Sequence, residues 1–153
     1  MSDTANFLLL ETTQGPVKIK FRPDLAPGHV ARIAELASSG FYDGVVFHRV
    51  IEGFMAQTGD PTGTGRGGSG KNLKAEFNKG RHVRGAASMA RAQHPDSADS
   101  QFFIVFSDAS FLDGQYTVWG EVVEGMENVD KIKRGEPVQN PDKIVSMKVA
   151  GDK

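Results

Sequence analysis

The chain has 153 residues, which is long enough for one domain with a sizeable hydrophobic core. Lysine and arginine number 18 and aspartate and glutamate 19, so the net charge of −1 argues against a protein that binds nucleic acid or a membrane through a basic surface. Cysteine is absent, which excludes a disulfide framework and a thiolate metal site.

The start of the chain predicts no targeting segment. Residues 1–6 contain no basic residue, and the apolar run at residues 7–10 is too short for the core of a signal peptide. No later stretch approaches the length of a membrane span. Together with the lack of cysteine, these features lead us to expect a single cytoplasmic domain over residues 1–153.

The first predicted elements are a β-hairpin and a helix. Residues 17–21 alternate between apolar and polar side chains, as a half-buried strand does, and they follow the apolar run at 7–12 across Gln14-Gly15-Pro16. A helix is predicted from about Pro27 to Ser39, because proline suits a first helical turn and glycine suits the position after the end. Its apolar residues at helical spacing are Val30, Ile33, Ala34 and Ala37.

The rest of the chain predicts short strands and one more helix. Strands are expected at residues 45–51, 54–57, 86–90, 102–106, 117–123 and 144–149. A short helix is expected from Met126, through Val129 and Ile132, to an end near Gly135. Many short strands with two isolated helices favour a closed antiparallel barrel over an alternating α/β sheet.

The glycine-rich segment at residues 63–70 imitates a phosphate-binding loop. Residues 65–71 fit G-x-x-x-x-G-K, but Asn72 follows where serine or threonine would hold magnesium. The sequence after it is also too short and broken for the required helix. We therefore expect a surface loop and no nucleotide site.

The four histidines predict no metal site, because no two of them lie three or four residues apart and no carboxylate completes a ligand set. A catalytic triad can be assembled on paper from Ser88, His48 and Asp99. No G-x-S-x-G turn surrounds Ser88, however, so nothing marks it as a nucleophile. His48 is better explained as a structural residue or as part of a groove wall beside Arg49.

Arg49 is the most informative charged residue. It lies in a strand-like run between Phe47 and Ile51, and a period of two would turn all three side chains toward the same face. A cation on an inner face needs a reason, whereas an arginine paired with a carboxylate on the surface needs none. The residues alone leave both interpretations open.

Three runs together resemble the cyclophilin family of peptidyl-prolyl cis-trans isomerases. They are FHRVIEGFMAQTGD at residues 47–60, SQFFI at 100–104 and FLDG at 111–114, and the likeness covers nearly the whole chain. The resemblance implies an eight-stranded closed barrel with a helix at each end, proline-containing peptides and proteins as substrates, and no cofactor. We expect a monomer that contacts neither nucleic acid nor membrane.

The resemblance also implies the site residues. The catalytic group would be Arg49, Phe54, Gln57 and Phe103. Substrate would further contact His48, Met55, Ala90, Arg91, Gln101, Phe111, Leu112 and Tyr116. Adjacent residues of a strand point to opposite faces, so Phe102 would belong to the core and Phe103 to the pocket. The remaining alternative is a proline-binding module or chaperone with little turnover.

Some residues depart from the family pattern. Members that bind cyclosporin carry tryptophan at the position of Phe111 and histidine at that of Tyr116. Phenylalanine cannot donate the indole N–H bond, so weak cyclosporin binding is expected. Arg91 stands in place of an asparagine whose backbone contacts substrate, and the segment at 91–99 is one residue longer than the common version.

Overall fold

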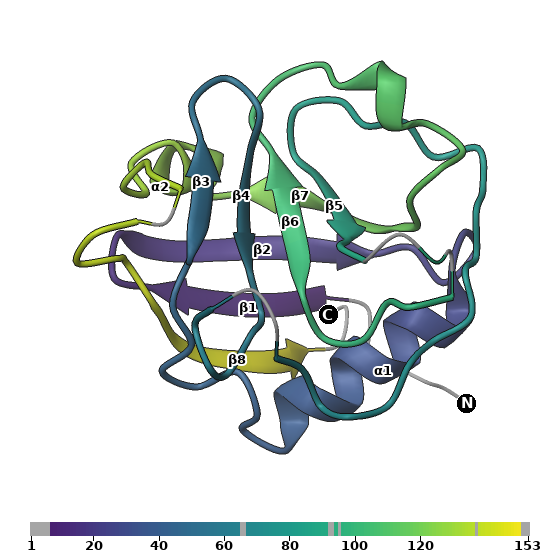
Figure 1. Ribbon diagram of the computed structural model, residues 1–153, viewed down its shortest axis with the longest axis horizontal. Helices are drawn as coiled ribbons and strands as arrows, with labels where there is room; N and C mark the ends of the chain where they lie inside the picture. Colours follow the sequence, from purple (N-terminus) through teal and green to yellow (C-terminus); the bar gives the residue numbers. More distant parts are fainter. Residues whose placement is uncertain (1–6, 65–66, 92–93, 95, 137, 151–153) are drawn as a thin grey trace.

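The molecule is organised around one curled antiparallel sheet of eight strands, seen in a computed structural model that describes residues 7–64, 67–91, 94, 96–136 and 138–150 (Figure 1). The strands follow the order β3-β4-β6-β5-β7-β2-β1-β8 across the sheet. Their bounds are β1 Phe7–Thr12, β2 Gly15–Phe21, β3 Arg49–Ile51, β4 Met55–Thr58, β5 Ala86–Met89, β6 Phe102–Val105, β7 Val118–Glu124 and β8 Ile144–Ala150. Two α-helices, α1 Pro27–Ser38 and α2 Met126–Val129, and a 3₁₀ turn at Ser110–Leu112 complete the fold, so the predicted mainly β class is confirmed.

The hairpin of β1 and β2 forms as the alternating pattern predicts. Thr12 pairs with Gly15 at the turn, and the Thr12 hydroxyl donates to the Gly15 carbonyl oxygen at 2.8 Å. Val17 and Ile19 are buried while Lys20 between Ile19 and Phe21 is exposed. One face of β2 therefore joins the core and the other meets solvent.

Helix α1 begins at Pro27, as predicted, and its free N–H groups are satisfied from outside the helix. The backbone N–H groups of Gly28 and His29 donate to the Glu76 carboxylate at 3.0 and 2.8 Å. A carboxylate at this end also matches the positive end of the helix dipole. The helix is thereby fixed to the loop that follows the glycine-rich segment.

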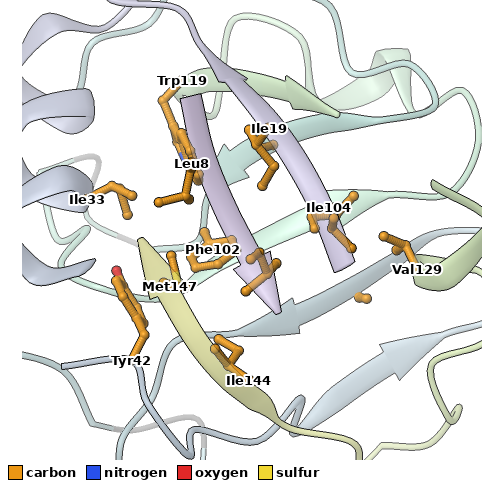
Figure 2. Packing of buried hydrophobic residues seen from close by; sticks show 14 of the residues in the cluster. Leu8, Ile19, Ile33, Tyr42, Phe102, Ile104, Trp119, Val129, Ile144 and Met147 are labelled. Atoms are coloured by element: carbon orange, nitrogen blue, oxygen red, sulfur yellow. The ribbon is translucent and has the colours of Figure 1, made fainter. Parts of the chain in front are cut away.

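The hydrophobic core fills the inside of the curled sheet. Figure 2 shows Ile33 of α1 and Val129 of α2 at its two ends, with Leu8, Ile19 and Ile104 from the strands between them. All five side chains are shielded from solvent. The two helices thus close opposite ends of one core.

The expected closed barrel is not confirmed, because the end strands β3 and β8 are not neighbours in the sheet. Val50 in the middle of β3 exchanges both backbone hydrogen bonds with Gly135 at 2.8 Å, which occupies the free edge of this short strand. Isolated contacts join the two ends instead. Val46 and Lys143 form a single bridge, and the Phe47 N–H donates to the Asp142 carbonyl oxygen at 2.8 Å.

Helix α2 is shorter than predicted. After Val129 the backbone changes to tighter bonding, in which Lys131 and Ile132 donate to carbonyl oxygens three residues earlier. Ile132 still reaches the core, which explains why its helical spacing extended the prediction. Within the described residues, no helix is long and apolar enough to cross a membrane.

Candidate active site

One row of side chains crosses four strands on the outer face of the sheet. Arg49 on β3 lies opposite Gln57 on β4, Gln57 lies opposite Phe103 on β6, and Phe103 lies opposite Ser88 on β5. Opposite residues of antiparallel strands point to the same face. The neighbouring row, which contains Val50, faces the core instead. The sheet register alone therefore gathers a cation, an amide, an aromatic ring and a hydroxyl on one face.

A hollow of about 210 Å³ opens over this row. Nine of the residues predicted for the site line it: Arg49, Phe54, Met55, Gln57, Ala90, Arg91, Phe103, Leu112 and Tyr116. Met55 and Phe103 belong to a small hydrophobic cluster that is separate from the main core, whereas Phe102 belongs to the main core. The hollow therefore combines polar and apolar side chains. The apolar ones suit a small apolar group, and the polar ones suit the peptide that carries it.

The predicted direction of Arg49 is wrong in one respect. Phe47 is buried in the main core, whereas the Arg49 side chain is 46% exposed on the opposite face. The period of two fails because β3 starts only at Arg49, and residues 47 and 48 lie outside the ladder. Ile51, two residues after Arg49 in the same strand, does share its face and packs on the cluster beneath the hollow.

Two partners hold the guanidinium of Arg49. Its Nε donates to Glu136 Oε1 at 3.1 Å, and its Nη1 donates to Gln57 Oε1 at 3.3 Å. Among the described residues, its Nη2 has no hydrogen-bond acceptor. A planar cation is therefore anchored on one side and keeps donors for a ligand in the hollow.

The amides of Gln57 and Gln101 continue this network. Gln57 Nε2 donates to Gln101 Oε1 at 2.9 Å, and Gln101 Nε2 donates to the Gly67 carbonyl oxygen at 3.0 Å. Each amide accepts from the Arg49 side and donates onward, so its orientation is determined. Gly59, which follows β4, lets the backbone pass close to Ser100, which precedes β6. Its φ of +100° favours glycine, and a side chain there would collide with the Ser100 backbone.

A second hollow of about 540 Å³ adjoins the first and shares Gln57, Ala90 and Arg91 with it. The glycine-rich segment forms its far side, where Ser69 and the Gly70 N–H donate to Asp99. Residues 65 and 66, with which the imitation of a phosphate loop begins, lie outside the described residues, as do 92, 93 and 95 of the 91–99 segment. No helix follows the segment within residues 67–91.

Aromatic and cationic side chains form the rim. Phe111 is 67% exposed, and its ring centroid lies 5.7 Å from that of Phe54. The Arg91 guanidinium lies 4.6 Å from the Tyr116 ring centroid and donates from Nη2 to the Gln115 carbonyl oxygen at 2.8 Å. Tyr116 therefore lines the hollow, whereas Phe111 does not line it and packs against Phe54, which does.

His48 lies beside the hollow and does not line it. Its side chain is buried, and burial lowers its pKa below the ordinary 6.5, with Asp60 opposing the shift. The proposed grouping of Ser88 with His48 and Asp99 does not occur either. Ser88 Oγ instead lies 2.8 Å from Nε2 of His82, whose Nδ1 lies 3.0 Å from Asp113.

Two contributors to the site carry no signal in the sequence. Glu136 contacts Arg49 from 87 positions away, and His82 is an isolated histidine in a loop. Neither has a spacing or a neighbour that connects it to the predicted motifs. Among the described residues, no group of three or more histidine, aspartate or glutamate side chains is arranged to hold a metal ion.

Comparisons with known sequences relate residues 7–149 to the family described as cyclophilin type peptidyl-prolyl cis-trans isomerase/CLD. A probable peptidyl-prolyl cis-trans isomerase of Brucella abortus (strain 2308) is 50% identical and is matched over 99% of this chain and 86% of its own length. Peptidyl-prolyl cis-trans isomerase B of Bacillus subtilis (strain 168) is 44% identical over 87% of this chain and 92% of its own.

Solved structures show the same likeness. A cyclophilin from Hirschia baltica has a TM-score of 0.88 and 31% identity, covering 96% of this chain and 74% of its own. A cyclophilin type peptidyl-prolyl cis-trans isomerase from Cryptosporidium parvum, crystallised in the presence of the dipeptide ala-pro, has a TM-score of 0.88 and 29% identity. The match to the second protein covers 95% of this chain and 99% of that one.

Proposed function

This chain belongs to the family of cyclophilin-type peptidyl-prolyl cis-trans isomerases, and we propose that it twists Xaa-Pro bonds by an arginine hydrogen bond within an apolar hollow. The observation that carries the proposal is the position of Arg49 on the wall of a hollow that Phe54, Met55, Phe103 and Leu112 also line. The proline ring occupies this hollow, between Phe103 and Leu112. The substrates are proline-containing segments of other proteins in the cytoplasm.

The reaction requires only rotation. The Xaa-Pro bond has a barrier of about 18–20 kcal/mol, and unaided exchange takes about tens to hundreds of seconds. Twisting removes the nitrogen lone pair from conjugation, so the nitrogen becomes pyramidal and accepts a hydrogen bond. Arg49 donates that bond, and an arginine side chain has only donors to offer. The enzyme thus favours the twisted amide over the planar one.

Arg49 accounts for only part of the rate. One hydrogen bond from a charged group contributes about 1.5–3 kcal/mol net, which corresponds to about ten- to a hundredfold in rate. The remainder comes from enclosure of the proline ring by Phe54, Met55, Phe103 and Leu112. A planar amide is more polar than a twisted one, so apolar surroundings weaken the ground state relative to the transition state.

The test is the exchange rate of a short proline peptide, followed without a coupled protease, in Arg49→Ala and Arg49→Lys. We expect kcat/KM to fall at least about tenfold in Arg49→Ala, and Arg49→Lys to retain part of the activity because it keeps the charge. Arg22→Ala is the matched control, since Arg22 is also an arginine paired with carboxylates but directly follows β2 and does not line the hollow. A near-normal rate in Arg49→Ala would refute the role of Arg49.

The same experiment distinguishes an isomerase from a simple binder of proline segments. Peptide affinity is measured by calorimetry in parallel with the exchange rate. Binding without turnover in the unmodified protein would favour the module or chaperone, because binding alone does not require a donor to the twisted amide.

A further inference from the structure

His82 is buried behind the wall of the hollow and is held at both ring nitrogens. Its side chain is 0% exposed. Nδ1 lies 3.0 Å from Oδ1 of Asp113, and Nε2 lies 2.8 Å from Oγ of Ser88. The backbone N–H of His82 donates to the same Asp113 oxygen at 2.7 Å. The ring is therefore fixed in position as well as in tilt.

The ring of His82 contacts two aromatic residues that line the hollow. It stacks on Phe103 with a centroid distance of 6.1 Å and an interplanar angle of 22°, and it meets Tyr116 edge-on at 6.4 Å. Phe103 and Tyr116 also meet edge-on at 5.9 Å. Each ring restricts the others, so the tilt of His82 limits the tilt of Phe103.

The two hydrogen-bonding partners of His82 belong to the frame of the hollow. Asp113 directly follows Leu112, which lines the hollow, and Ser88 lies opposite Phe103 across β5 and β6. A nucleophilic role for Ser88 does not fit, since its side chain is completely buried. Through Asp113 and Ser88, His82 instead connects the segment that contains Leu112 to the strand pair that contains Phe103.

The protons can be assigned from the partners. A carboxylate only accepts, so neutral His82 carries its proton on Nδ1 and the Ser88 hydroxyl donates to Nε2. The Thr117 carbonyl oxygen, 3.1 Å from Ser88 Oγ, still receives the Met89 N–H at 2.9 Å. Burial lowers the pKa of His82 and Asp113 opposes the shift, so the neutral form prevails at pH 7. Every polar group of the assembly is then satisfied.

From this geometry we propose that His82 is a positioning residue, which holds the Phe103 ring in the orientation that receives the proline ring. His82 does not touch the substrate. It acts through Phe103, and the inference therefore rests on the proposed role of Phe103 in the hollow. An aromatic wall that can rotate would enclose the proline ring less well, and the rate would fall although the fold survives.

The test compares His82→Asn with His29→Asn. Both histidines are fully buried and donate to a carboxylate, His29 to Glu76 at 2.6 Å, but His29 lies on α1 away from the hollow. We expect a lower stability in both variants and a fall of about tenfold in kcat/KM only in His82→Asn, measured well below the unfolding temperature. His82→Phe keeps a flat ring in contact with Phe103 and should recover part of the loss.

Two further measurements separate positioning from stability. In a Phe103→Leu background, His82→Asn should have little further effect on kcat/KM, because the ring on which it acts is gone. Ring signals of Phe103 in protein labelled with ¹³C-phenylalanine should shift in His82→Asn and stay in place in His29→Asn. If His82→Asn does not fold, His82→Phe provides the same comparisons against His29→Phe.

The outcomes are distinct. A normal kcat/KM in folded His82→Asn, or an equal fall in the Phe103→Leu background, would overturn the inference. If Phe103→Leu alone leaves kcat/KM unchanged, the assignment of the hollow fails first. If Phe103→Leu is impaired and the His82 variants are not, the role of His82 alone is refuted.

Discussion

Arg49 and Gln57 lie directly opposite each other on neighbouring strands, and Arg49 Nη1 donates to Gln57 Oε1 at 3.3 Å. The partner that orients the guanidinium is thus part of the same sheet. Glu136, the other partner, comes from the segment after α2 and is 53% exposed. Exposed ion pairs contribute about 0–1 kcal/mol. The sheet contact should therefore matter more for the reaction.

We expect Gln57→Leu to lower kcat/KM about tenfold and Glu136→Gln to lower it less than about threefold. Leucine removes the acceptor for Arg49 and the donor to Gln101, whereas glutamine at 136 can still accept from Nε. Both variants are to be assayed on one uncharged proline peptide, with circular dichroism as the control for folding. The reverse order of effects would mean that the loop orients Arg49.

Turnover should be nearly independent of pH from about 6 to 9. The proposed mechanism transfers no proton, and arginine stays charged over this range. His48 is the nearest titrating neighbour in the sequence, and burial lowers its pKa below 6.5. The rate is followed across the range with stability checked at each point. A tenfold loss on acidification that is absent in His48→Gln would assign the chemistry to His48 and contradict the arginine mechanism.

Stability, in contrast, should fall with acidification below about pH 6.5. Burial lowers the pKa of His29, His48 and His82, so the unfolded chain binds protons that the folded chain resists. The stability that these neutral histidines contribute is fully present above about pH 6.5 and is lost as the pH falls toward their lowered pKa values. Protonating His29 would also leave an N–H at Nε2 with no acceptor among the described residues.

Urea unfolding at pH 7.5 and pH 5.5 measures this effect. We expect a lower midpoint at pH 5.5 in the unmodified protein and a smaller difference between the two pH values in His29→Asn. Carboxylates such as Asp142, whose pKa is lowered from 3.8 in the fold, lose their contribution only below that value. An unchanged midpoint at pH 5.5 would show that these histidines protonate freely in the folded protein.

Phe111→Trp should raise the affinity for cyclosporin at least about tenfold and leave kcat/KM within about twofold. Phe111 is exposed at the rim, and tryptophan would add an indole N–H donor there. Calorimetry with the drug and the peptide exchange assay give the two values. If the affinity does not change, Tyr116→His is the next variant, since Tyr116 lines the hollow.

The sequence predicted most elements because their signals are local. The hairpin of β1 and β2 and the start of α1 follow from alternation and from Pro27. The face that period two would give to both Phe47 and Arg49 is not shared, because strand periodicity holds only inside a ladder and β3 begins at Arg49. The closed barrel was not confirmed, since β3 does not pair with β8 and Gly135 occupies the free edge of β3.

The residues that hold the site in place, Glu136 and His82, are brought there by tertiary contacts that no local sequence pattern encodes. Glu136 reaches Arg49 across 87 positions, and His82 reaches Phe103 through a ring stack. The resemblance named the residues that line the hollow and the amides of Gln57 and Gln101, but neither Glu136 nor His82. Such contacts depend on where loops pack, which spacing along the chain does not determine.

The row that joins Arg49, Gln57, Phe103 and Ser88 makes activity depend on correct strand pairing. Successive residues of a strand face opposite sides, so a shift of one residue between β4 and β6 would send Phe103 inward and Phe102 outward. Such a molecule would have neither a proper core nor an active site. Activity per milligram of protein therefore reports the fraction of chains with correct strand pairing. In a refolding experiment, the rate of peptide exchange would measure how much of the protein has refolded correctly.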